Sequence, residues 1–267
     1  MIIVRILGGL GNQMFQYAYA KSLQQKGFDV QLDISSFKSY KLHGGYQLEK
    51  FNIDLKYVNN TKLFFKKINI LNTKKEKNLL FNKTYIDLKG SEYVKGYFQT
   101  ENYFLDIRNT ILEQFSLETP LSKTTKNYKT AIESYKISCS IHIRRGDYIT
   151  DENSNKIHGT CSLNYYKEAV NIITNKYKNV AFFVFSDDIS WTKKNLKLEN
   201  TTYVEHKTIP HEDMYLMSLC SHNITANSSF SWWGAWLNKH KNKTIIAPKK
   251  WFVHKQNEVA CKSWIKI

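Results

Sequence analysis

The pattern of apolar and polar positions predicts a strand, a glycine loop and a helix at the start of the chain. Ile2–Leu7 is a short apolar run, Gly8–Gly11 is a glycine-rich loop, and Asn12–Lys26 carries apolar residues at helical spacing. Val30–Ile34 then predicts a second strand. Residues 35–130 alternate short apolar pieces with Lys- and Asn-rich stretches, so we expect insertions and loops there.

A regular alternation of strands and helices begins at residue 137. The predicted elements are strand 137–143, helix 163–177, strand 180–186, helix 190–197, strand 202–204, helix 211–222, strand 223–226, helix 229–240 and strand 244–246. This alternation is typical of a parallel sheet with helices on both faces, and the short apolar strands fit burial on both sides. We therefore expect an α/β fold of two lobes with a cleft between them, divided into residues 1–130 and 131–267.

The composition of the 267 residues indicates a folded protein. With 42% apolar and 14% aromatic residues the chain can bury large cores, which argues against disorder. The start, MIIVRILGGLGNQMF, lacks the features of a signal peptide, and no run reaches the roughly 18 apolar residues of a membrane span. The four cysteines form no CxxC pair and show no metal-ligand spacing. We expect a cytoplasmic protein without structural zinc.

The formal net charge of +16 favours anionic partners. Its lysines are scattered and form no basic-aromatic motif, so nucleic-acid binding is the weaker interpretation and a solvated cationic surface the stronger one. Peripheral contact with an anionic membrane surface is a further expectation from the same charge. Nucleotide phosphates are the third class of anion that the charge would attract.

Compact polar or glycine-rich clusters follow four of the predicted strands. They are Gly8–Gln13, Arg144–Tyr148, Ser186–Asp188 and Ala226–Phe230. Because ligands of open α/β sheets bind outside the carboxyl ends of the strands, these clusters are the candidate site. Segments that only formed a core would need no such arrangement.

The first cluster nearly matches a dinucleotide-binding fingerprint. Gly9 and Gly11 have the expected spacing, and Asp33 ends the second strand about where an acid that binds a ribose would lie. Met14, however, replaces the third glycine, and its bulk opposes close packing of helix and strand. An NAD-dependent oxidoreductase is therefore kept as an alternative, and so is a tight turn without a ligand.

Arg144 and Arg145 are the sharpest chemical feature of the sequence. Neighbouring residues that leave a strand point in opposite directions, so we expect one to face a ligand and the other a structural acid, with Asp147 as one candidate partner. The planar guanidinium fork matches phosphate oxygens bidentately. The pair therefore predicts an anion clamp.

Polar residues at three predicted helix starts allow a structural and a functional interpretation. Asn227–Phe230 begins a helix, where Ser228 or Ser229 can cap and the free N–H groups can bind phosphate. Asp213, early on its helix, either stabilises the helix dipole or binds a ligand N–H edge. Asp187 and Asp188 are likewise a cap or a contact to ribose or base.

Four stretches in this order, GLGNQMFQYA, HIRRGDY, FSDD and ANSSFSWWGAWL, resemble the bacterial α-1,2-fucosyltransferases. The resemblance spans residues 1–250. It implies inverting transfer of L-fucose from GDP-β-L-fucose to a galactose hydroxyl, a metal-independent reaction, and a GT-B fold of two Rossmann-like lobes. The C-terminal lobe is then expected to bind GDP-fucose, and the N-terminal lobe, with the glycine loop, to face a galactose-terminated oligosaccharide or glycolipid acceptor.

The same resemblance implies roles for individual residues. Arg144 matches the arginine that holds the β-phosphate, His142 and Asp213 match positions near guanine or ribose, and Asn12 matches an asparagine near the fucose and diphosphate. The further residues expected at GDP-fucose are Arg145, Asp187, Asp188, Asn227, Ser228, Ser229 and Phe230.

The residue that would accept the proton of the galactose hydroxyl is less well defined by the resemblance. In the α-1,6 relatives a glutamate follows the arginine at a short distance, and Glu152 occupies a similar offset here. The surrounding stretch, ITDENSNKIHG, departs from the family pattern. Asp147, Asp151 and His158 therefore stay open as alternatives, as does a phosphate oxygen of the leaving group.

Overall fold

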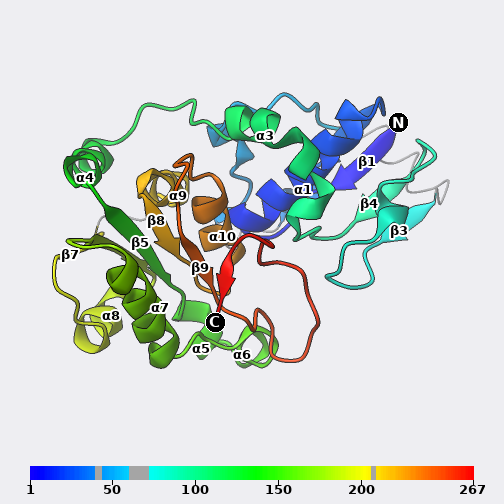
Figure 1. Cartoon of the computed structure of the whole chain (residues 1–267). Coiled ribbons are helices and arrows are strands. Elements are labelled where there is room, and N and C mark those ends of the chain that lie inside the picture. Colours follow the sequence, from blue (N-terminus) through cyan, green and yellow to red (C-terminus); the bar gives the residue numbers. More distant parts are fainter. Residues whose placement is uncertain (40–43, 60–71, 206–208) are drawn as a thin grey trace. The chain divides into compact units, whose positions relative to one another are not determined.

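The computed structural model describes residues 1–39, 44–59, 72–205 and 209–267, except the side chains of Asp147, Thr150, Asn153 and Ser154. The chain forms two compact units (Figure 1). Unit 1 comprises Met1–Thr119 with Gln256–Val259, and unit 2 comprises Pro120–Lys255 with Ala260–Ile267. The predicted boundary at 130/131 falls inside helix α4 (Lys123–Ser134), which packs against α9 (Pro210–Leu219) and belongs to unit 2.

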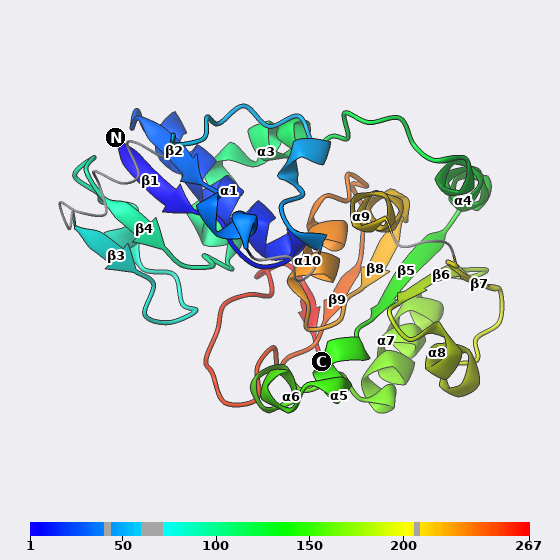
Figure 2. The ribbon, with the colours of Figure 1, turned by 180° about the vertical axis from the view of Figure 1, so that it is seen from behind.

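Unit 1 contains a parallel sheet in the strand order β2-β1-β4-β3 (Figure 2). The strands are β1 (Ile2–Arg5), β2 (Val30–Asp33), β3 (Thr73–Lys75) and β4 (Tyr93–Lys95). The first two agree with the apolar runs of the sequence. The other two lie in the stretch predicted as loops, because strands of three residues with lysines carry too little apolar pattern to be recognised.

Helix α1 (Leu10–Gln25) is the core of unit 1. It begins two residues before the predicted Asn12, and Gly8, with φ of +82°, makes the turn that precedes it. Tyr19 of α1 stacks on Phe98 with ring centroids 3.9 Å apart, and its hydroxyl donates to the carbonyl oxygen of Tyr85 at 2.6 Å. Aromatic packing of this kind orders the irregular middle of the chain.

Short helices make up most of the remaining regular structure of unit 1. They are the 3₁₀ turns η1 (Ser35–Lys38), η3 (Leu48–Lys50), η4 (Lys83–Tyr85), η5 (Glu101–Tyr103) and η6 (Leu105–Ile107), and helix α3 (Arg108–Gln114). Asn82 and Thr100 cap η4 and η5 through their side-chain oxygens, which explains why these polar stretches fold locally.

Unit 2 is built on a second parallel sheet, in the order β10-β9-β8-β5-β6-β7. Its strands are β5 (Ser138–Ile143), β6 (Ala181–Ser186), β7 (Thr201–Tyr203), β8 (His222–Ile224), β9 (Ile245–Ala247) and β10 (Ile265–Lys266). The helices besides α4 and α9 are α5 (Gly146–Thr150), α6 (Glu152–His158), α7 (Leu163–Lys176), α8 (Ile189–Asn195) and α10 (Ser229–Trp236). The predicted alternation is confirmed from β5 to β9, and α5 and α6, which lie between β5 and α7, were not predicted.

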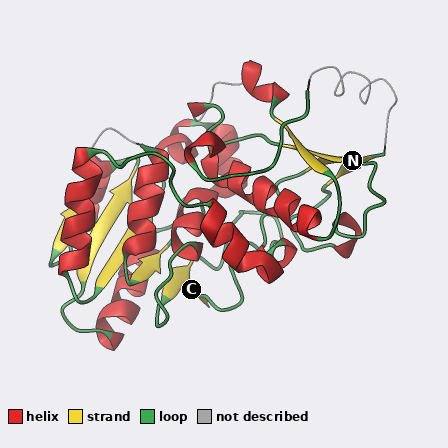
Figure 3. Cartoon of the chain, turned by 90° about the horizontal axis from the view of Figure 1, so that it is seen from above, coloured by secondary structure: helices red, strands yellow, loops and turns green. Residues whose placement is uncertain are grey.

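Helices cover both faces of this sheet (Figure 3). On one face, Ile141 of β5 packs in a buried cluster with Ala169 and Ile173 of α7. On the other, Asn223 of β8 donates to the hydroxyl of Ser140 and to the carbonyl oxygen of Met217 in α9, both at 2.8 Å. Because side chains alternate along a strand, His142 lies on the same face as Ser140, toward α9 and α10.

The tryptophans of α10 belong to the core of unit 2. Trp232 and Trp236 are buried, and their rings stack with centroids 5.9 Å apart. Among the described residues, no helix is long and apolar enough to cross a membrane.

Candidate functional site

The pairing of β5 with β6 brings two of the predicted clusters together. The strands are parallel, and Ile143, the last residue of β5, is paired with Ser186, the last residue of β6. Arg144 and Asp187 therefore leave the sheet side by side at its carboxyl edge. This is the edge at which open α/β sheets bind ligands.

Asp187 is bonded through both of its carboxylate oxygens. Oδ2 lies 3.0 Å from Nη1 of Arg144, and Oδ1 accepts the backbone N–H of Arg145 at 2.9 Å. The Arg144 guanidinium also lies over the ring of Tyr148, with Cζ 5.6 Å from the ring centroid. Arg144 is therefore held by Asp187 and Tyr148. The side chains of Arg144 and Asp187 are 29% and 24% exposed, so the guanidinium still reaches solvent.

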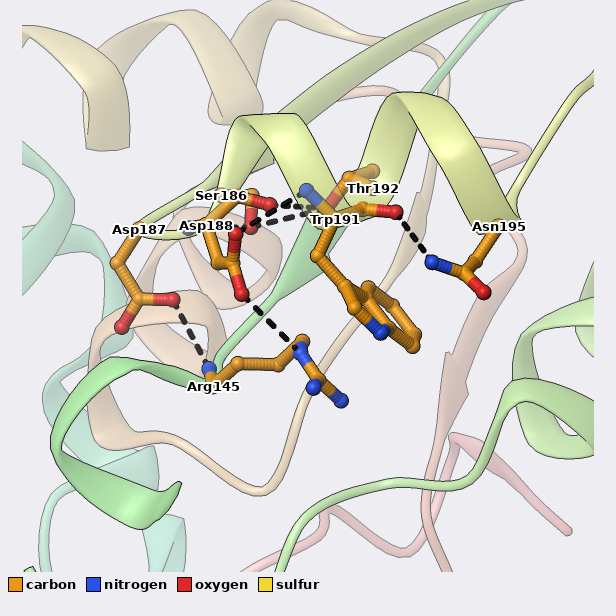
Figure 4. Close-up of polar contacts among 7 residues, drawn as sticks. All are labelled: Arg145, Ser186, Asp187, Asp188, Trp191, Thr192 and Asn195. Carbon is orange, nitrogen blue, oxygen red and sulfur yellow. Dashed lines mark hydrogen bonds and ion pairs between the residues drawn. The ribbon is translucent and has the colours of Figure 1, made fainter. Parts of the chain in front are cut away.

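Arg145 is held against α8 (Figure 4). Its guanidinium lies 3.6 Å from the centroid of the Trp191 ring, and its Nε lies 3.4 Å from Oδ2 of Asp188. Oδ1 of Asp188 accepts the N–H of Trp191 at 3.1 Å and so caps α8. Asp188 thus has the structural role of a cap, and Arg145 packs by a cation–π contact.

The sequence predicts that one arginine faces a ligand and the other a structural acid, and the structure gives each of them an acidic partner. Arg144 and Arg145 each pair with an aspartate that follows β6. Asp147 was one candidate partner, and its side chain lies outside the described residues, while its backbone belongs to α5. The sequence shows all three acids and cannot show which strand end lies beside which.

Gly146 is required by the close approach of Asp187. A Cβ atom at this position would lie 2.7 Å from Oδ2 of Asp187, a distance that real Cβ contacts essentially never show, and 3.2 Å from its Cγ, so the carboxylate would have to shift. The glycine of the RRG stretch therefore makes room for the carboxylate that contacts Arg144. Sequence reasoning missed this role, because its signal lies in the strand pairing.

His142, near the end of β5 and two residues before Arg144, is buried, and only 6% of it is exposed. Its ring is 5.4 Å from that of Phe230, and no hydrogen-bond partner of Nδ1 is found among the described residues. Burial lowers the pKa of His142 to about 4; Asp187 opposes this effect and Arg144 adds to it. The imidazole is therefore neutral at neutral pH.

Asn227 is an anchor between loops of unit 2. Its amide donates to the carbonyl oxygens of His158 at 2.8 Å and Gly159 at 3.2 Å, and its Oδ1 lies 3.5 Å from Sγ of Cys161. The residue is 2% exposed. These contacts give Asn227 a structural role next to the start of α10.

Of the two serines that the sequence allows as a cap, Ser228 is the N-cap of α10. Its side-chain oxygen accepts the N–H of Phe230 at 3.3 Å, and Ser229 is the first helical residue. At the start of α9, Asp213 lies in the first turn with a buried Oδ1. The neighbouring Glu212, which was not recognised, accepts hydrogen bonds from both hydroxyls of Ser122 and Thr125 and joins α9 to α4.

Glu152, the predicted base, lies at the exposed start of α6. Its Oε1 is 2.7 Å from Nζ of Lys156, and its side chain is 82% exposed. This is the geometry of a surface ion pair on a helix. Of the alternatives, Asp151 is exposed, and His158 stacks on Tyr148 with ring centroids 4.8 Å apart. The assignment of Glu152 stays a prediction without a contact that supports it.

The glycine loop of unit 1 is held by amide side chains. Gln13 donates to the carbonyl oxygens of Gly8 and Gly45, both at 2.8 Å. Oδ1 of Asn12 accepts a hydrogen bond from Gln99 at 2.7 Å. The sequence placed Asn12 at the helix start and did not identify the partners of either amide.

Asp33 is not available as an acid that binds ribose. It is 2% exposed, accepts a hydrogen bond from the hydroxyl of Tyr93, and accepts the N–H of Ser35 at 2.9 Å. The NAD-dependent alternative therefore loses its acidic residue. Among the residues that the structure describes, no group of three or more His, Cys, Asp or Glu side chains is arranged to hold a metal ion.

Comparison with known proteins gives the family. The whole chain, residues 1–267, matches the model of glycosyl transferase family 11. The protein is a member of this family. This family 11 glycosyltransferase is 36% identical over 292 residues to an alpha-1,2-colitosyltransferase from Escherichia coli, covering 100% of this chain and 99% of that protein. It is 23% identical over 167 residues to a galactoside alpha-(1,2)-fucosyltransferase 1 from Leontopithecus chrysomelas, covering 57% of this chain and 45% of the relative.

The fold of the chain resembles that of a solved structure. The family 11 glycosyltransferase aligns with NodZ alpha-1,6-fucosyltransferase co-crystallized with GDP at a TM-score of 0.51 and 14% identity, over 87% of this chain and 90% of that one. Together with two units that each carry a parallel sheet, this similarity confirms the predicted GT-B class of α/β fold.

Proposed function

We propose that this glycosyltransferase moves L-fucose from GDP-β-L-fucose to the 2-hydroxyl of a terminal β-galactoside, with inversion, to form an α-1,2 linkage. The observation that carries the proposal is the fixed guanidinium of Arg144 at the carboxyl edge of the unit 2 sheet, beside the neutral His142. The names of both relatives given above state an α-1,2 linkage, which supports the same linkage here.

The proposed chemistry needs positive groups at the leaving diphosphate. Negative charge grows on GDP as the glycosidic bond breaks, and donors that are already oriented stabilise it most effectively. Arg144 can supply two parallel N–H donors, and the start of α10 at Ser229 adds backbone N–H groups. GDP-fucose is the donor substrate and no cofactor is proposed.

We propose that the reaction is independent of metal ions, because these groups would take the place of a cation at the diphosphate. Transfer should be unchanged after exhaustive treatment with EDTA. If Mn²⁺ or Mg²⁺ restores a lost rate more than tenfold, the leaving-group charge is stabilised in another way.

The relative with the higher sequence identity suggests a second candidate for the donor substrate. Colitose is L-fucose without its 3-hydroxyl, and the colitosyltransferase shares 36% of its aligned residues with this chain. GDP-colitose is therefore the second candidate donor for the same site. A site that binds the 3-hydroxyl of fucose discriminates strongly against the deoxy sugar, whereas an apolar site does not.

Thermal denaturation with added nucleotide tests the nucleotide class. GDP should raise the melting temperature, and NAD⁺ at the same concentration should not. Competition between GDP-fucose and GDP-colitose for a common galactoside then ranks the donors. Stabilisation by NAD⁺ alone would reinstate the oxidoreductase, and retention on DNA at physiological salt would reinstate nucleic-acid binding.

A galactose-terminated oligosaccharide or glycolipid is the proposed acceptor. A glycolipid would bring the protein to a membrane surface, where its net charge of +16 favours anionic lipid. Sedimentation with vesicles of anionic and of neutral lipid tests this contact. Equal binding to both kinds of vesicle would show that the charge is not responsible.

A further inference from the structure

We propose that Asp187 is a positioning residue that acts through Arg144 and does not itself contact the nucleotide. The inference rests on the proposed function, since it assigns the diphosphate of GDP to Arg144. It replaces the expectation that Asp187 contacts ribose or base. Its basis is the use of both carboxylate oxygens within the protein.

The two contacts of Asp187 fix different parts of the RRG stretch. Oδ1 holds the backbone N–H of Arg145 at 2.9 Å, and Oδ2 holds the side chain of Arg144 at 3.0 Å. The carboxylate therefore sets the path of the chain after β5 together with the direction of the guanidinium. A bidentate contact with phosphate depends on that direction, because the guanidinium fork is planar.

Gly146 leaves room for Oδ2 of Asp187, where any other residue would place a Cβ at 2.7 Å. A side chain at this position would therefore displace the carboxylate from its two contacts. Asp188, the next residue, is held by the start of α8 and by Arg145. The residue that follows Asp187 is thus itself fixed, which supports the carboxylate as an orienting group.

The variant that tests this role most selectively is Asp187→Asn. The amide can keep an oxygen for the N–H of Arg145, but it loses the charge that attracts Arg144. We expect the affinity for GDP to fall about tenfold or more and the affinity for guanosine, which has no phosphate, to stay within twofold. Glu133→Gln removes the same charge from an exposed pair with Lys129 and serves as the control.

A double-mutant cycle separates positioning from simple structural support. If Asp187 acts through Arg144, Asp187→Asn should not lower GDP affinity or transfer further in an Arg144→Ala protein. Effects that add in the double variant, or an equal loss of guanosine and GDP affinity in Asp187→Asn, would overturn the proposal. If Asp187→Asn does not fold, Asp187→Ala replaces it in the same cycle.

The outcome for wild type separates this inference from the proposed function. Wild-type protein that does not bind GDP contradicts both. Wild-type protein that binds GDP and loses nothing on Asp187→Asn contradicts only the positioning role. Measurement of GDP binding by calorimetry on the complete chain distinguishes the two cases.

Discussion

Replacing Gly146 by alanine tests the packing at the carboxyl edge of the unit 2 sheet with a single methyl group. Two effects oppose each other. Alanine is favoured over glycine within a helix by up to about 1 kcal/mol. The new Cβ would, however, lie 2.7 Å from Oδ2 of Asp187, so the carboxylate must move by several tenths of an ångström.

The carboxylate cannot move without loss, because its two oxygens bind the backbone of Arg145 and the side chain of Arg144. A hydrogen bond to a charged group contributes about 1.5–3 kcal/mol to stability, and a partly exposed ion pair up to about 1 kcal/mol. After the helix preference of alanine is subtracted, we expect Gly146→Ala to lower the free energy of unfolding by about 1–2 kcal/mol. Catalysis should suffer more, roughly 10-fold to 10²-fold in kcat/KM, since small displacements of a group that binds the transition state are costly.

The assay for Gly146→Ala combines thermal denaturation with the kinetics of sugar transfer. The same substitution in an Asp187→Ala protein is the internal control, because the clash has then been removed and no further loss of kcat/KM is expected. A Gly146→Ala protein with a raised melting temperature and normal transfer would refute the packing argument. Equal losses in both backgrounds would place the effect in the backbone of α5.

Three further predictions concern other residues of the site. Arg144→Ala should lower turnover by about 10²-fold or more in a folded protein, and Arg144→Lys should rescue little, because an ammonium group lacks the planar fork; turnover within threefold of wild type in either variant contradicts the clamp. Glu152→Gln should lower turnover about 10²-fold with GDP affinity unchanged if this residue is the base, and near-normal transfer would return the role to Asp147, Asp151, His158 or the leaving phosphate. Because the pKa of His142 is lowered to about 4 in the folded protein, the unfolded chain takes up this proton first as pH falls, and the free energy of unfolding decreases from about pH 6.5 toward pH 4 by about 3 kcal/mol. His142→Gln should flatten this pH dependence of unfolding. An unchanged pH dependence would assign it to other groups such as His222.

From β5 to β9 the strands of unit 2 and the helices α7, α8, α9 and α10 could be predicted from the sequence to within a few residues, because these strands are short apolar runs and these helices have clear starts. β5 and β6 are the best examples: all of β5 is buried, and in β6 all but Ser186. Helices α4, α5 and α6 and strand β10 were not predicted. In unit 1 the same method failed over β3 and β4, two strands of three residues each that are ordered by pairing with each other and with β1 and carry no periodic pattern.

The candidate site was predictable in its residue types and not in its pairings. The sequence places arginines after β5 and aspartates after β6, and the register between the strands then decides that Arg144 meets Asp187 and Arg145 meets Asp188. For Asn227 even the role expected from its residue type is replaced by another. The sequence presents its amide as a ligand group, but in the structure the amide donates to backbone carbonyl oxygens about 70 residues away in the chain, which no local pattern encodes.

Linkage analysis of the reaction product tests the proposed function most directly. The protein is incubated with GDP-β-L-fucose and a panel of galactose-terminated acceptors, and the product is analysed by NMR for anomeric configuration and linkage position. We predict an α-L-fucosyl group on the 2-hydroxyl of a terminal β-galactose, formed by wild type and reduced about 10²-fold or more in Arg144→Ala. Transfer to another hydroxyl, a β-linked product, or transfer only from a donor other than GDP-fucose would contradict the proposed reaction.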